Sequence, residues 1–199
     1  MLSYKVKIGI APCRRDMPSR PGQPRRRMRM WSAEAAKEVL DVVVPYIKNN
    51  FANEHVEFVD LEGITEDGMM WDYMQAEKLA EYFRGEKIDA LFIPNINFGS
   101  EEVAGKLASL LNLPTLIWAV QDEEFGETET KDIYDDNYGI RLLDAQCGLF
   151  AVSKLLQRYH VKFSQIPTCK VDSDTFKEGF VDLFSKTTCV KGATTTVLT

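Results

Sequence analysis

Histidine and paired cysteine, the side chains that most often bind zinc or form nucleophilic pairs, are scarce in this 199-residue chain. The two histidines, His55 and His160, lie far apart in the sequence. Four cysteines are present at widely separated positions: Cys13, Cys147, Cys169 and Cys189. None of them has the C-x-x-C spacing of a redox pair or a zinc site, so we expect small buried hydrophobic residues. The sequence predicts no catalytic residue and no metal ligand within this chain.

Long apolar runs and the common nucleotide-binding motifs are also lacking. No run approaches the roughly 18 apolar residues of a membrane span, and the first residues lack the apolar core of a secretory signal. We therefore expect a cytoplasmic protein with no membrane partner. Neither G-x-G-x-x-G nor G-x-x-x-x-G-K-[ST] occurs. The net charge of −6 disfavours a general nucleic-acid binder, so we expect no nucleic-acid partner.

Strand and helix patterns alternate along the whole chain. Hydrophobic residues make up 45% of it, enough for one sizeable core. The predicted strands are Val6–Pro12, Val56–Leu61, Ala90–Pro94, Thr115–Val120 and a fifth within Val161–Val171. The predicted helices are Met30–Phe51, Met69–Phe83, Ser100–Leu111, Leu142–Tyr159 and Asp174–Lys186. This alternation predicts a single α/β domain over residues 1–199, a three-layer sandwich with a five-stranded parallel sheet, flavodoxin-like or Rossmann-like.

Three residues mark predicted helix ends. Ser32 and Ser100 are suitable N-caps, and the acids after Ser100 suit the first turn of a helix. Gly85 follows the predicted helix Met69–Phe83, where glycine often ends a helix.

The segment after the first predicted strand is rich in arginine. Seven arginines and one acidic residue lie between Arg14 and Arg29. Three interpretations remain open: a loop that binds a ligand, a nucleic-acid arm, and a solvated loop that balances the acidic remainder. The loop Gln121–Gly139 has the opposite character, with eight acids and one lysine. Such a loop could bind a divalent cation or be solvated.

A candidate binding site follows from the predicted fold. In the common strand order 2-1-3-4-5, ligands bind past the carboxyl ends of strands one and three. The arginine loop and the segment Pro94–Glu102 would meet there. Arginine can donate to two neighbouring oxygens, and asparagine both donates and accepts, so these side chains suit a polyhydroxylated or anionic ligand. The candidates are Arg14, Arg15, Asn95, Asn97 and, for stacking on a sugar face or for a core position, Trp118.

Four segments, taken in order, resemble the N-terminal region of the L-fucose isomerase-like family, which is related to the L-arabinose isomerases. They are "KVKIGIAP", "IPNINFGSEEVAGKLA", "LPTLIWAVQDEE" and "LLDAQCGLFAVSKLLQRYHVKFSQIPTCKVDSDTFKEGF". The resemblance runs from about Lys5 to about Thr188. It implies that this chain is the N-terminal domain of a longer, multi-domain enzyme that interconverts aldoses and ketoses. The chain's last residues, "VKGATTTVLT", are expected to lead toward the second domain.

The resemblance also implies a role for this domain. In the fucose isomerases it helps to close the sugar pocket of a neighbouring subunit, so we expect a monosaccharide substrate and a homo-oligomer. Arg14 and Arg15 match the family's arginine in the first strand–helix loop about equally well. A tryptophan expected near Ile96 is missing, and Asn97 and Phe98 could line the same pocket. The Mn²⁺ of the family is held by the other domains, so no cofactor is expected on this chain.

A different class of function stays open. The chain could be a standalone, non-catalytic module that binds a sugar or another metabolite. Weak sugar binding by the isolated chain, without metal or turnover, would favour this alternative, whereas a much larger native polypeptide would favour the isomerase domain.

Overall fold

The computed structural model describes residues 5–15, 33–121 and 143–190 of the chain. Its centre is a five-stranded parallel sheet in the order β2-β1-β3-β4-β5. The strands are β1 (Val6–Ile10), β2 (Val56–Val59), β3 (Ala90–Asn95), β4 (Thr115–Ala119) and β5 (Phe163–Gln165). The helices are α2 (Ala33–Phe51), α3 (Gln75–Glu86), α4 (Glu101–Leu111), α5 (Ala145–Arg158) and α6 (Asp174–Val190). The predicted fold class and strand order are confirmed.

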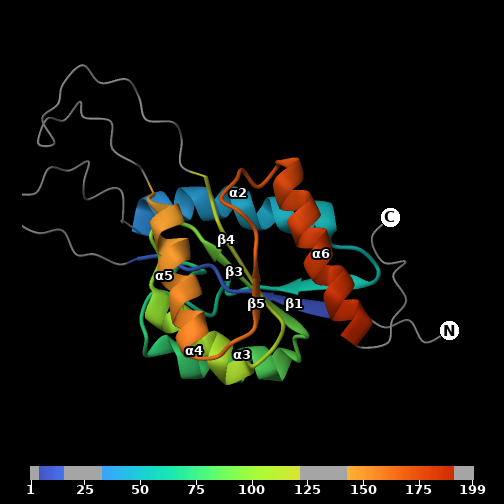
Figure 1. Ribbon diagram of the computed structural model, residues 1–199, viewed down its shortest axis with the longest axis horizontal. Helices are drawn as coiled ribbons and strands as arrows, with labels where there is room; N and C mark the ends of the chain where they lie inside the picture. The colour runs from blue at the N-terminus through green and yellow to red at the C-terminus, as the bar shows by residue number, and fades with distance from the viewer. Residues whose placement is uncertain (1–4, 16–32, 122–142, 191–199) are drawn as a thin grey trace, which may run out of the picture.

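Helices cover both faces of the sheet (Figure 1). Apolar side chains of α3, α4 and α5 form one buried cluster with one face, and those of α2 and α6 form a second cluster with the other. Every residue of β3 and β4 is buried, as expected for central strands covered on both faces. The layers therefore leave the strand ends, rather than the sheet faces, available for a site.

The largest difference from the sequence prediction lies at the start of α3. The helix begins at Gln75 and not at Met69, because residues 69–74 make other hydrogen bonds. The Gln75 side chain accepts the N–H groups of Trp71 (2.9 Å) and Asp72 (3.0 Å). Met70 instead lies beside Cys13 as a continuation of the sheet. The apolar residues Met69 and Met70 are buried there, so their periodicity came from the sheet edge and not from a helix.

The end of α3 also differs. The helix runs past Gly85 to Glu86 and closes at Lys87, whose φ of 58° is left-handed. The Lys87 N–H donates to Arg84 O at 3.1 Å. The predicted stop at Gly85 was therefore wrong by two residues. Met30, Ser32 and Leu142, at predicted helix starts, lie outside the described residues; α5 begins at Ala145, and α6 extends beyond the predicted Lys186.

The cysteines partly follow the prediction. Cys13 and Cys169 are buried free thiols and Cys147 is half-buried. In the described segments, no helix has both the length and the apolar character that a membrane crossing requires.

Candidate functional site

Three loops lie side by side at the carboxyl edge of the sheet. Cys13, just after β1, pairs with Asn95 on one side and with Met70 on the other. The Cys13 N–H donates to Pro94 O (2.9 Å), and Ile96 N–H donates to Cys13 O (3.0 Å). Arg14 N–H donates to Met70 O at 3.0 Å. The predicted meeting of the loops after β1 and β3 is confirmed, and the loop after β2 forms a third wall that was not predicted from the sequence.

Arg14 is turned toward this third wall. Its side chain is 5% exposed, and Nε donates to Asp67 Oδ2 at 2.5 Å. The guanidinium carbon lies 5.0 Å from the centroid of the Trp71 ring. Asp67 Oδ1 also accepts the Met69 N–H at 3.1 Å. Arg14 therefore joins the loops after β1 and β2, and its charge is compensated within the protein.

Arg15 is turned the other way, toward the loop after β3. Its guanidinium carbon lies 4.9 Å from the Phe98 ring centroid, and Nη1 lies 3.4 Å from Glu101 Oε2. The side chain is 36% exposed. An arginine has five donor hydrogens in a fixed plane, so the contact with Glu101, the one polar contact of this guanidinium among the described residues, leaves donors for a ligand. Of the two adjacent arginines, Arg15 is the one in the crevice between β1 and β3.

Asn97 fixes the main chain around the crevice. Its Oδ1 accepts the N–H groups of Arg15 (2.7 Å) and Gly99 (3.0 Å). Gly99 has a φ of 77°, a conformation that favours glycine. Its missing Cβ would lie 3.1 Å from Asn95 Oδ1. The asparagine and glycine predicted to shape this loop thus lie together at its centre.

Asn95 and Asn97 also bring unused hydrogen-bonding groups to this edge. Both residues are buried. Among the described residues, neither polar atom of the Asn95 side chain has a partner, and the same holds for Asn97 Nδ2. Buried amide groups without hydrogen-bond partners are uncommon in proteins. These two residues therefore mark the loop after β3 as a candidate functional site.

Trp118 lies apart from the other candidate residues. It is fully buried on the face of the sheet that α2 and α6 cover. Its ring centroid lies 4.8 Å from that of Phe176 and 6.4 Å from that of Phe92. Of the two positions that the sequence left open, the structure gives it the core one.

The thiol of Cys13 joins the site to the start of α4. Sγ accepts the Ser100 N–H at 3.1 Å and donates to Ser100 O at 3.3 Å. Ser100 is the predicted N-cap residue, but its own side chain makes no capping hydrogen bond. Burial raises the pKa of the Cys13 thiol to about 12, so the group stays protonated and acts as a structural tie.

Gly148 lets α5 approach the loop after β3. A Cβ at this position would lie 1.6 Å from Phe98 O, closer than any two such atoms can come. The backbone of α5 therefore packs directly on the peptide between Phe98 and Gly99. The dipeptide Asp67-Gly68 is typical of a turn and indicated the loop that forms the third wall. It was not used because the helix was predicted to begin directly after it, at Met69.

Two predicted features lie outside the described residues. They are the arginine-rich segment beyond Arg15 and the acidic loop after Gln121. Within the described ranges, no three histidine, cysteine, aspartate or glutamate side chains converge to hold a metal ion.

The family described as the fucose/sulfoquinovose isomerase N-terminal domain matches residues 26–194. The chain belongs to this family. The matched range contains the loop after β3 and Gly148, and begins after Arg14 and Arg15. No curated protein matches the chain significantly. The resemblance stated from the sequence is confirmed, and the chain is an isomerase-related domain.

Proposed function

We propose that this chain closes the substrate pocket and forms part of the subunit interface in a metal-dependent aldose–ketose isomerase. The family description names two monosaccharides, fucose and sulfoquinovose, and a monosaccharide is the substrate class we assign. The metal, Mn²⁺ by analogy with the fucose isomerases, belongs to the remaining domains of the enzyme. We place this homo-oligomeric enzyme in the cytoplasm.

The position of Arg15 carries this proposal. It is a partly exposed guanidinium that lies against an aromatic ring, beside two buried asparagines, at the edge where α/β sheets bind ligands. Arginine in such a position can donate to adjacent sugar hydroxyls or to an anionic substituent. Arg14, which is buried and paired with Asp67, supports the loop and does not face the sugar.

The test is kinetic and uses the full-length enzyme. Arg15→Ala is expected to raise KM for the sugar by roughly tenfold to a hundredfold, since a hydrogen bond from a charged group is worth about 1.5–3 kcal/mol. Arg158→Ala is the matched control, because Arg158 is exposed at the end of α5. An unchanged KM for Arg15→Ala would indicate that Arg15 is a solvated surface residue. The proposal that this chain closes the substrate pocket would then lose its main support.

A further inference from the structure

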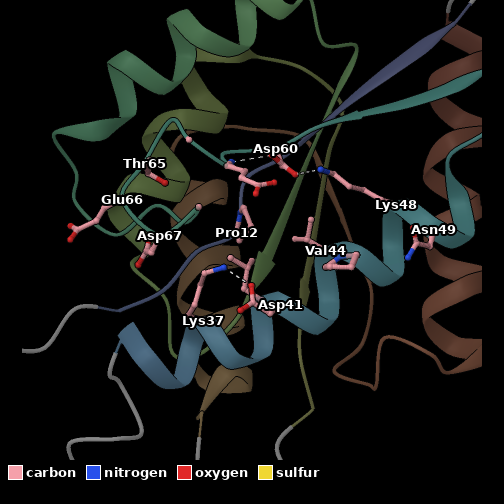
Figure 2. A pocket seen from close by; sticks show the side chains of 15 residues that line it. Pro12, Lys37, Asp41, Val44, Lys48, Asn49, Asp60, Thr65, Glu66 and Asp67 are labelled. Atoms are coloured by element: carbon pink, nitrogen blue, oxygen red, sulfur yellow. Dashed lines mark hydrogen bonds and ion pairs between the residues drawn. The ribbon is translucent and has the colours of Figure 1, made fainter.

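A second hollow lies between α2 and the loop that follows β2 (Figure 2). This hollow, here named the α2 groove, has a volume of about 540 Å³, within the usual range for small-molecule sites. Leu40, Val44 and Pro45 of α2 form one wall, and residues 60–68 form the other. The groove contains neither Arg15 nor Asn97, and it shares with the site described above the loop after β2, including Asp67.

Paired charges surround the α2 groove. Lys48 forms an ion pair with Asp60 across the groove, and Lys37 pairs with Asp41 along α2 (Figure 2). Asp60 Oδ1 also accepts the Glu62 N–H at 3.0 Å, which fixes its orientation. Because both lysines already have carboxylate partners, neither is an uncompensated cation that would attract an anion.

The remaining lining charges are acidic. Glu62, Glu66 and Asp67 also line the groove, so carboxylates exceed ammonium groups there. The negative charge of Asp67 is compensated by its ion pair with Arg14. This balance disfavours phosphorylated or otherwise anionic ligands, which would meet net negative charge.

The groove still has ample hydrogen-bonding capacity. The Thr65 hydroxyl is buried and has no partner within the described structure. Each lysine ammonium carries three donors, and each carboxylate can accept several hydrogen bonds. Pro45 lies inside α2 and has no N–H to donate to the Asp41 carbonyl, which therefore lacks its usual helical partner. Donors and acceptors thus lie beside the apolar residues of α2.

From this chemistry we propose that the α2 groove binds an uncharged, polyhydroxylated small molecule of about the size of a mono- or disaccharide. Neighbouring hydroxyls both donate and accept, which suits compensated ion pairs and the Thr65 hydroxyl. The carbon skeleton of such a molecule can lie on Leu40, Val44 and Pro45. The proposal does not depend on the isomerase function, because no residue of the crevice contributes to it except through the Arg14–Asp67 pair.

The experiment is an NMR titration of the isotopically labelled full chain. The uncharged probes are D-glucose, L-fucose and maltose, and D-glucose 6-phosphate is the anionic comparison. At least one uncharged probe is expected to shift the amides of Leu40, Gly63 and Thr65 saturably at millimolar concentration. The phosphate ester is expected to bind at least several-fold more weakly. Shifts confined to Arg15 and Asn97, or no saturable shifts, would overturn the groove proposal and leave the isomerase proposal to its own test.

Two variants make the result specific. Thr65→Val removes the hydroxyl and keeps the shape, and should weaken binding roughly three- to tenfold, the value of one hydrogen bond. Ser153→Ala removes a hydroxyl that donates within α5, to Phe150 O, and should leave the affinity unchanged. Equal affinity of Thr65→Val and the native chain would contradict the assigned role of Thr65 and, with it, the proposed site.

Discussion

The Cys13 thiol is enclosed where the end of β1 meets the start of α4, and its proton is held there. Burial raises its pKa to about 12, against 9.0 for an ordinary thiol, and this outweighs the hydrogen bond from Ser100 N–H. Below pH 9 the thiol is protonated in both the folded and the unfolded chain. Between pH 9 and 12 only the unfolded chain loses the proton, so the free energy of unfolding falls as pH rises.

This shift gives a prediction for alkaline pH. From about pH 9 upward, the native chain should lose about 1.4 kcal/mol of stability per pH unit from this one group. Cys13→Ser keeps a donor and an acceptor but does not titrate in this range, so its stability should fall less steeply. Urea unfolding at pH 8, 9, 10 and 11 measures both slopes. Parallel curves for the two proteins would contradict the enclosed, protonated thiol.

Replacing the two neighbouring arginines should have different effects on stability, because Arg14 supports the fold and Arg15 is assigned to binding. Arg14→Met leaves the Asp67 carboxylate, 15% exposed, without its cation and should cost roughly 3 kcal/mol, the lower end of the range for a broken buried pair. Arg15→Met breaks a half-exposed pair and should cost less than about 1 kcal/mol.

Chemical denaturation of these two variants and of Arg14→Met combined with Asp67→Leu tests the pairing. The double variant should recover part of the loss, because no unpaired carboxylate remains. Equal destabilisation by Arg14→Met and Arg15→Met would contradict the division of roles between the two arginines.

Helix α5 and the loop after β3 are packed backbone against backbone, and this contact gives a prediction for the elements. Gly148→Ala should destabilise the protein by about 2 kcal/mol or more, because either α5 or the Phe98 peptide has to move. Gly85→Ala in α3 is the matched control, since nothing lies within 4 Å of a Cβ there. It should stabilise by about 0.5–1 kcal/mol.

Thermal denaturation measures whether each variant is less or more stable than the native chain. Hydrogen exchange of the Gly99 amide measures how well the loop after β3 stays ordered. That amide donates to Asn97 Oδ1 at 3.0 Å, so Gly148→Ala should speed its exchange while Gly85→Ala leaves it unchanged. A neutral Gly148→Ala variant would show that the close approach is not required.

The elements differ in how well the sequence predicted them. Buried strands such as β3 and β4 are apolar runs bounded by polar residues, so their position follows from local pattern alone. The start of α3 was wrong because Met70 pairs with Cys13, a contact between distant parts of the chain that leaves no local pattern. For the same reason Asp67 and Trp71 were missed as neighbours of Arg14. The meeting of Arg15 with Asn97 was predictable, because strand order determines which loops are adjacent.

For the whole molecule, the proposed function requires a longer polypeptide. An antibody raised against this chain should detect, in a lysate of the source cells, a protein roughly two to three times heavier than 22.7 kDa, since domains commonly have 100–200 residues. Intact-mass measurement of the captured protein gives the value. A native protein of 22.7 kDa would mean that the protein has no metal-binding domains. A standalone binding module would then be the leading function.

The contact between Gly148 and Phe98 O also limits how the family can diverge. A side chain at position 148 is incompatible with the present positions of α5 and of residues 97–99, so one of the two has to shift to accommodate it. Relatives with a larger residue at this position should therefore have a loop after β3 of different length or path. That loop carries Asn97, which the proposed function places beside the sugar, so under that proposal such relatives would select different sugars.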